Sequence, residues 1–248
     1  MTGRTTGSVL GAQIDALSWD AALARLLGWA HARASRYVTI CNVHVVVSAS
    51  RDAGYRGIIN GSDMATPDGA PVAWMLRRQG FANQPRISGP DLMWALCARA
   101  AAEFIPIYCY GSTPSTLALL ESRLRAAFPD LRMVMESPPF RALTTEEDAA
   151  AVDRINTSGA GIVFVGLGCP KQERWMAGHR GKIDAVMIGV GAAFDFHAGT
   201  VRRAPAWMRA HGLEWLHRLL SEPRRLWKRY LVTNTLFIVG AARQLLGK

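Results

Sequence analysis

Residues 160–179 read AGIVFVGLGCPKQERWMAGH, and this stretch decides the fold. Its first half, up to Gly168, is a short apolar run that predicts a strand. Its second half opens with Pro170, a residue favoured in the first turn of a helix, and continues with a helical pattern. A strand followed at once by a helix is the repeating unit of a parallel α/β sheet.

The same alternation runs through the first two hundred residues. The run 37–47 is a continuous β-branched run, as expected for a strand buried on both faces. Helical patterns separate the strands, and capping residues open three of them: Ser18, Ser88 with Asp91, and Thr144 with Glu147. The sequence therefore predicts an α/β fold with a mostly parallel sheet and flanking helices. The predicted strands are 8–17, 37–47, 105–111, 160–168 and 183–196, and the predicted helices are 19–32, 88–103, 112–128, 144–155 and 170–179.

Ligands of such sheets bind beyond the carboxyl ends of the strands. The loops of interest are those that follow Asn42, Met64, Tyr110, Val165 and Val190.

The charge of the chain is concentrated at one end. The net charge is +10, and residues 200–248 hold ten Lys and Arg against two acids, a net +8. This segment has no strand pattern and is broken at Pro205, Gly212 and Pro223, so it predicts a basic helical appendage, residues 201–248, on a core of residues 1–200.

Aromatic and aliphatic residues alternate with the arginines of the appendage. The apolar run of the appendage, residues 231–239, is too short to span a bilayer and is interrupted by polar residues at 233–235. The pattern instead fits a helix that lies on an anionic membrane surface. Binding to single-stranded nucleic acid, or an ordinary charged face, fits it as well.

Two glycine-rich strand exits, after Val165 and after Val190, are candidate binding loops. Gly166 and Gly168 would let backbone N–H groups approach a phosphate or a sugar at a helix N-terminus. A dinucleotide fingerprint would add a third glycine and a ribose-binding acid, which are not in place, so an NAD(P)-dependent oxidoreductase is an alternative with weak support. A tight strand–helix turn with exposed Gln172 and Glu173 explains the same residues.

Four polar residues each allow either a structural or a functional interpretation. Asp195 and His197 form an acid/base pair or a metal site, or more commonly serve structure alone. Arg86 is a phosphate clamp or a solvated surface arginine. Asp68, in MATPDGAPVAW at 64–74, either closes a turn or removes a proton.

The remaining features point to the cytosol. The N-terminus lacks the apolar core of a signal peptide. Four scattered cysteines form no C-x-x-C pair, which predicts buried reduced thiols instead of a zinc site or disulfides.

Six blocks together carry a family resemblance: TPDGAP (66–71), RISGPDL (86–92), YCYGSTPS (108–115), VGLGCPKQERWM (165–176), GVGAAFDFHAGTVRRAPAWM (189–208) and GLEWLHRLLSEPRRLWKRY (212–230). In this order they resemble the signature blocks of the WecG/TagA/CpsF glycosyltransferases, from about Val9 to Tyr230.

The resemblance implies a Rossmann-like core with a membrane-directed appendage. It also implies an inverting, metal-independent bacterial enzyme without a cofactor, which moves a hexose from a UDP-sugar to a polyprenyl-diphosphate-linked sugar. N-acetylmannosamine, its uronic acid and glucose are the candidate sugars. The expected partners are these two substrates and the inner face of the cell membrane, with no nucleic acid; a non-catalytic membrane or nucleic-acid adaptor remains an alternative.

The resemblance also assigns residues by position. Asp68 matches the proposed catalytic base. The family usually has Thr-x-Asn at the pocket, where this chain has Thr39-Ile-Cys-Asn42. The other pocket residues that match are Arg86, Gln172 with Glu173 beside it, and the appendage arginines Arg218, Arg225 and Arg229.

These residues suit the chemistry of inverting sugar transfer. Inverting transfer needs one base to deprotonate the acceptor hydroxyl, so a single carboxylate suffices. The chain has no Asp-x-Asp motif for a metal ion on the departing diphosphate, so bidentate arginines are the expected substitute.

Overall fold

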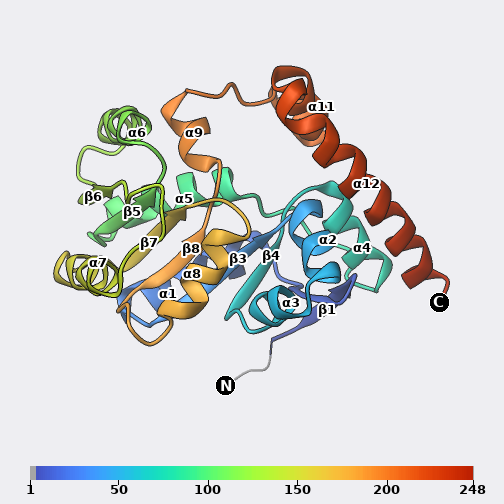
Figure 1. The fold of residues 1–248 in the computed structure, drawn as a ribbon, viewed down its shortest axis with the longest axis horizontal. Coiled ribbons are helices and arrows are strands. Elements are labelled where there is room, and N and C mark those ends of the chain that lie inside the picture. Colours follow the sequence, from blue (N-terminus) through green and yellow to red (C-terminus); the bar gives the residue numbers. More distant parts are fainter. Residues whose placement is uncertain (1–3, 248) are drawn as a thin grey trace.

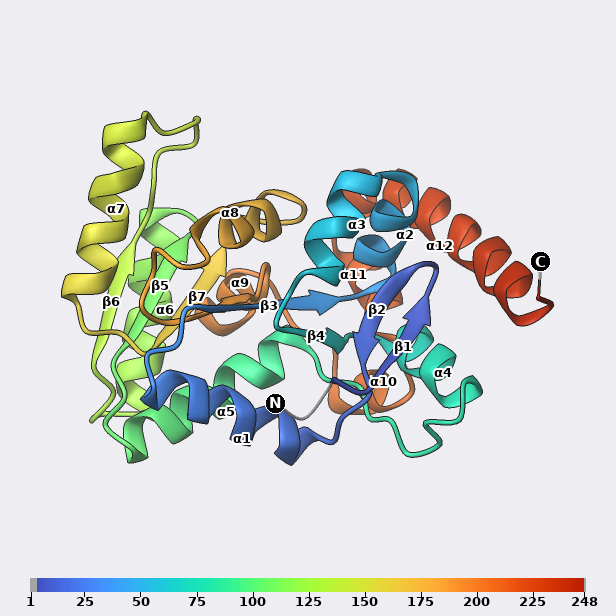
Figure 2. The same cartoon turned by 90° about the horizontal axis from the view of Figure 1, so that it is seen from below.

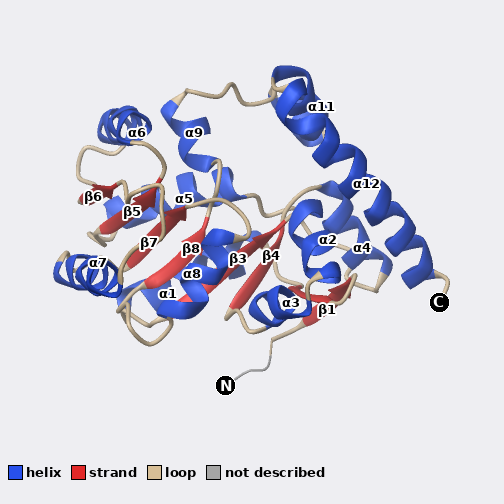
Figure 3. Ribbon diagram, in the orientation of Figure 1, coloured by secondary structure: helices blue, strands red, loops and turns tan. Residues whose placement is uncertain are grey.

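The computed structural model describes residues 4–247, apart from the side chain of Arg225. Its centre is a six-stranded sheet in the order β4-β3-β8-β7-β5-β6, with every neighbouring pair parallel (Figure 3). The prediction of a mostly parallel α/β sheet with flanking helices is confirmed. The strands are β3 (Arg36–Cys41), β4 (Met64–Pro67), β5 (Ile107–Gly111), β6 (Met133–Glu136), β7 (Ile162–Gly166) and β8 (Val186–Gly189).

Helices cover both faces of the sheet, as Figure 2 shows from below. One face packs against α1 (Trp19–His31), α5 (Gly89–Ala102), α6 (Pro114–Ala127) and α9 (Ala193–Ala198). The other packs against α7 (Thr145–Thr157) and α8 (Lys171–His179). At the β4 end, a third cluster joins α2 (Val43–Arg51), α3 (Ala53–Asn60) and α4 (Ala70–Arg78) to a hairpin. All the strands except the edge strand β6 are thus largely buried, which is why their sequences are nearly continuous apolar runs.

Three predicted strands are shorter than expected. The run 8–17 is an antiparallel hairpin of β1 (Thr6–Val9) and β2 (Ala12–Asp15), because Leu10 and Gly11 both adopt positive φ in a two-residue turn. The run 37–47 ends as a strand at Cys41, because Asn42 caps helix α2. The run 183–196 ends as a strand at Gly189, after which a turn through Gly191, φ +54°, leads into α9.

Two of the three predicted caps form. The hydroxyl of Ser18 accepts from the N–H of Ala21, and Thr144 and Glu147 make a reciprocal capping box. Ser88 is the N-cap residue of α5, but its hydroxyl donates to Oδ2 of Asp91 at 2.5 Å and makes no bond to a helix N–H. The Ser88–Asp91 capping prediction is wrong because arginines hold the Asp91 carboxylate elsewhere, as described below.

The chain after residue 200 is helical and breaks where the sequence predicts. Its helices are α10 (Ala206–Ala210), α11 (Glu214–Ser221) and α12 (Pro223–Leu245), which runs along the outside of α2 (Figure 1). Phe237 and Ala241 of α12 are buried in the cluster that also holds the hairpin. None of the helices between residues 4 and 247 combines the length and the apolar character needed to cross a bilayer.

The four cysteines are free thiols, as predicted. Three are buried, whereas Cys169 is only partly so.

Candidate functional site

The carboxyl ends of β3 and β4 place two predicted residues side by side. The register pairs Cys41 with Pro67, so Asn42 and Asp68 leave neighbouring strands at the same level. The N–H of Asp68 donates to the carbonyl of Cys41 at 3.0 Å. The N–H of Ile87 donates to the carbonyl of Pro67 at 2.9 Å, which brings Arg86 to the same edge.

Asp68 is half-buried in the turn between β4 and α4. Burial raises the pKa of its carboxyl to about 6; Arg86 lowers that pKa, while Glu214 and Asp91 raise it. The next residue, Gly69, has φ +84°, which explains the glycine after this aspartate. The turn and the chemistry are therefore compatible: the loop holds Asp68 at the strand exit with its proton affinity increased.

Arg86 belongs to a network of charges between the core and the appendage. Its Nη1 donates to Oε2 of Glu214 at 2.9 Å, and its Nη2 lies 3.4 Å from Oδ2 of Asp91. Arg203 bridges the same two acids, at 2.7 Å from Asp91 and 3.4 Å from Glu214, and Arg209 lies 3.5 Å from Asp91. Burial opposes ionisation of Asp91, but hydrogen bonds from Arg203 and Ser88 lower its pKa to about 2.

Thr39 and Asn42 have different surroundings. Thr39 is fully buried inside β3, and its hydroxyl donates to Oγ of Ser62 at 3.3 Å. Asn42 is exposed at the end of the strand, where Oδ1 accepts from the N–H of Val45 at 3.1 Å. The cap uses the oxygen of the Asn42 amide, and no hydrogen bond from its NH₂ group is described within residues 4–247.

Gln172 and Glu173 lie at the start of α8, against the end of β8. A side-chain carbon added to Gly189 would lie 2.8 Å from Cε of Met176 and 3.0 Å from Nε2 of Gln172, so the glycine leaves room for these two side chains. Gln172 accepts from the N–H of Gly168 at 3.2 Å and donates to Oε1 of Glu173 at 2.8 Å. Both side chains are buried, so the expectation that they are exposed in a simple turn is wrong.

Glu173 is an incompletely paired acid. Its Oε2 is buried without a hydrogen-bond partner among the described residues. Burial raises the pKa of Glu173, although the hydrogen bond from Gln172 lowers it.

Two of the three predicted appendage arginines reach the strand exits, and the third, Arg225, has a side chain outside the described part. The guanidinium of Arg218 lies 5.3 Å from the ring centre of Phe196 in α9. Burial lowers the pKa of His44 and raises that of Cys169 to about 12, and Arg229 lies close enough to both groups to act on each pKa in the lowering direction. The Nε atoms of Arg218 and Arg229 are buried and have no partner within residues 4–247.

Asp195 and His197 both lie in α9. His197 donates or accepts at the carbonyl of Pro90, 2.8 Å away, and stacks on Trp94. Within the described residues, no three His, Cys, Asp or Glu side chains gather as a set of metal ligands.

Sequence reasoning assigned no site role to Asp91, Arg203, Arg209 or Glu214. Each stands inside a block quoted for the resemblance or directly beside one, but the pattern does not show that they converge on Arg86.

A comparison with known families identifies the family of the chain. The profile of the Glycosyl transferase WecG/TagA/CpsF family matches residues 7–248, almost the whole chain.

Proposed function

Because the chain belongs to the WecG/TagA/CpsF glycosyltransferase family, we propose that it transfers a hexose from a UDP-sugar to a sugar linked to polyprenyl diphosphate. Family membership makes it a glycosyltransferase of cell-surface polysaccharide synthesis, in preference to an oxidoreductase or an adaptor. What we propose beyond family membership is the identity of the donor nucleotide, of the transferred hexose and of the lipid-linked acceptor. N-acetylmannosamine, its uronic acid and glucose remain the candidate sugars.

The environment of Asp68 is the single observation that carries the proposal. A general base works best when its pKa lies near the working pH, and burial raises the pKa of Asp68 to about 6. Asp91 and Glu214, the acids that affect it, are both salt-bridged to arginines. Asp68 therefore removes the proton of the acceptor hydroxyl while that oxygen attacks the anomeric carbon on the face opposite UDP.

Cationic groups replace a metal ion in this mechanism. The diphosphate gains negative charge as it leaves, and guanidinium groups bind such oxygens through parallel N–H bonds. Arg218, beside Phe196 of α9, and Arg229, near His44 and Cys169, have buried Nε donors without a partner among the described residues, which suits them to this role. Arg225 is assigned with them by the family resemblance. The family resemblance also assigns Asn42, at the start of α2, Gln172 with Glu173, at the start of α8, and Thr39, in β3, to substrate binding.

The appendage, residues 201–248, brings this site to the lipid. Exposed apolar side chains on α10–α12 stand among basic residues, a combination that binds anionic membrane surfaces. The enzyme accordingly works in the cytoplasm at the inner face of the cell membrane. Deleting residues 201–248 is expected to release the protein from membranes and to abolish transfer.

The test is a screen of UDP-sugars with the purified full chain and a short-chain polyprenyl-diphosphate-linked sugar, with EDTA present. Transfer in EDTA that inverts the anomeric centre supports the proposal. Transfer that stops in EDTA and returns with a divalent cation would contradict the arginine-for-metal role. Binding of NAD(P)H, or of RNA without UDP, would favour the alternatives instead.

A further inference from the structure

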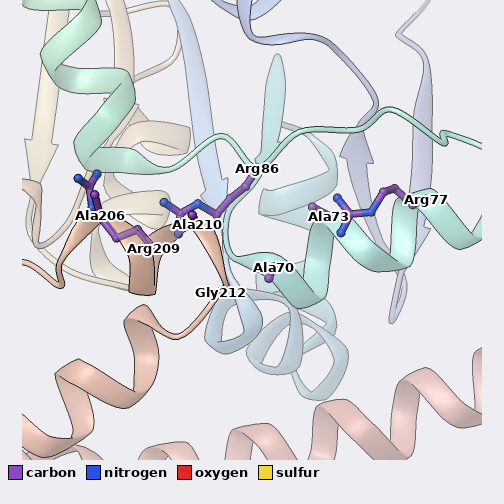
Figure 4. Close-up of a pocket in the computed structure, with 8 residues that line it drawn as sticks. All are labelled: Ala70, Ala73, Arg77, Arg86, Ala206, Arg209, Ala210 and Gly212. Atoms are coloured by element: carbon purple, nitrogen blue, oxygen red, sulfur yellow. The ribbon is translucent and has the colours of Figure 1, made fainter.

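A cavity of about 480 Å³ lies between α4 of the core and α10 of the appendage (Figure 4). Three arginines line it, Arg77, Arg86 and Arg209, and the close-up shows them entering from three separate segments. The other lining residues are small: Ala70, Ala73, Ala206, Ala210 and Gly212.

The lining is cationic and contains no carboxylate. Each arginine is held by a contact with a residue outside the lining: Arg77 donates to the carbonyl of Gln84 at 3.0 Å, Arg86 pairs with Glu214, and Arg209 pairs with Asp91. A guanidinium has five N–H donors, so one such contact leaves others free to bind a ligand. The Nε of Arg209 is buried and has no hydrogen-bond partner among the described residues.

Three guanidiniums around a small-residue cavity suit an anion with several oxygens. Glu214 and Asp91 compensate part of the charge of Arg86 and Arg209, and the N–H donors that these pairs leave over can bind an anion with several oxygens. A diphosphate offers oxygens to several forked donors at once, and a neutral sugar does not.

The position of the cavity separates it from the donor side of the site. It lies beside α4, whose first residue, Ala70, follows Asp68 by two positions. Arg218 and Arg229 instead lie near α9 and the start of α2. Arg86 lines the cavity and also lowers the pKa of Asp68, so an anion bound there is next to the base.

The surroundings of the cavity suit a lipid-linked ligand. Trp74 follows the lining residue Ala73 and is 43 % exposed, and Trp207 follows Ala206 and is 60 % exposed. Tryptophan side chains favour the headgroup level of a bilayer, where the phosphates of a membrane-anchored substrate also lie.

We propose that the cavity lined by Arg77, Arg86 and Arg209 binds the diphosphate of the lipid-linked acceptor, while the diphosphate of the donor binds elsewhere. This assignment rests on the proposed function for the acceptor's identity. It places the acceptor's first sugar between the cavity and Asp68.

The test compares two probes with the full chain by calorimetry, farnesyl diphosphate and UDP. Arg77→Gln and Arg209→Gln are each expected to weaken farnesyl diphosphate binding by roughly tenfold, about 1.4 kcal/mol, with UDP binding unchanged within about twofold. Arg78→Gln, on α4 but outside the lining, is the matched control and should bind both probes like the wild type. Ala210→Leu narrows the cavity with all arginines retained and should weaken farnesyl diphosphate binding too.

Unchanged farnesyl diphosphate binding in both arginine variants overturns the site, and an equal loss of UDP binding assigns it to the donor. Transfer kinetics distinguish this failure from failure of the proposed function. If the wild type transfers sugar and Arg209→Gln leaves the acceptor KM unchanged, the site is wrong and the function stands. If the wild type transfers nothing but the probe result holds, the diphosphate site stands and the function is wrong.

Discussion

Arg86, in the loop before α5, and Glu214, at the start of α11, form an ion pair at 2.9 Å across 128 residues of sequence. The pair joins the appendage to the core at the edge where Asp68 lies. Glu214 raises the pKa of Asp68, and Arg86 lowers it. The proton affinity of the proposed base therefore depends on a residue of the appendage.

The first prediction is a pH dependence of transfer. A base must be deprotonated to act, so kcat/KM should fall as the pH decreases through about 6, the pKa of Asp68. Glu214→Gln removes a negative charge that raises this pKa, so the acid limb should move to lower pH. Arg86→Gln removes a positive charge that lowers it, so the limb should move to higher pH. An acid limb that stays in place in both variants would show that Asp68 does not control the profile.

The second prediction concerns Asp68 itself. Asp68→Asn keeps the shape of the turn and removes the base, so transfer should fall roughly 10²–10⁴-fold. Because burial disfavours the charged carboxylate, the melting temperature of the variant should equal or exceed that of the wild type. Near-normal turnover in a folded Asp68→Asn protein would reject the assignment of the base.

The third prediction separates the two roles of Asn42. Asn42→Asp retains an oxygen that can accept from the N–H of Val45, so urea unfolding should match the wild type. The same change removes the amide donor that we assign to substrate, so transfer should fall by about tenfold. Asn42→Ala loses both functions and should also lose about 1 kcal/mol of stability. If Asn42→Asp transfers normally, the residue is only a helix cap.

The fourth prediction is a pH-dependent stability that comes from Glu173. Burial raises its folded pKa above the ordinary value of 4.5, so the protonated form stabilises the fold. That stability is fully present below the ordinary pKa and is lost as the pH rises through the folded pKa. Glu173→Gln keeps an oxygen for the bond from Gln172 and cannot ionise, so its melting temperature should change less than that of the wild type as the pH rises above 4.5. Identical pH curves for the two proteins would contradict this account.

The fifth prediction tests the membrane surface of α12. Leu231 and Ile238 are 62 % and 67 % exposed, and burying such side chains in lipid is favourable by about 1.5–3 kcal/mol each. Replacing both by Gln should reduce co-sedimentation with anionic vesicles by roughly tenfold or more. Leu119→Gln, on α6 at the opposite end of the sheet and 48 % exposed, is the control and should sediment like the wild type. Equal sedimentation of all three proteins would place the membrane contact elsewhere.

The sequence predicts the type of most elements because local periodicity is visible in it. It does not show where a strand gives way to a helix inside an apolar run. In 37–47 the change depends on one hydrogen bond from Val45 to the side chain of Asn42, and valines occupy both sides of it. For the same reason, the sequence does not show the turn at Leu10-Gly11 or the start of α9.

The sequence by itself determined the parallel α/β core, the helical basic appendage and the loop that carries Asp68, since apolar period, turn residues and charge are local properties. Only the tertiary structure decided that Asp68 is half-buried beside Asn42. It also decided that Asp91 pairs with arginines instead of forming a capping box, and that Glu214 pairs with Arg86. These relationships join residues far apart in the chain. Their energies come from desolvation and ion pairing, which exist only after packing has brought the residues together.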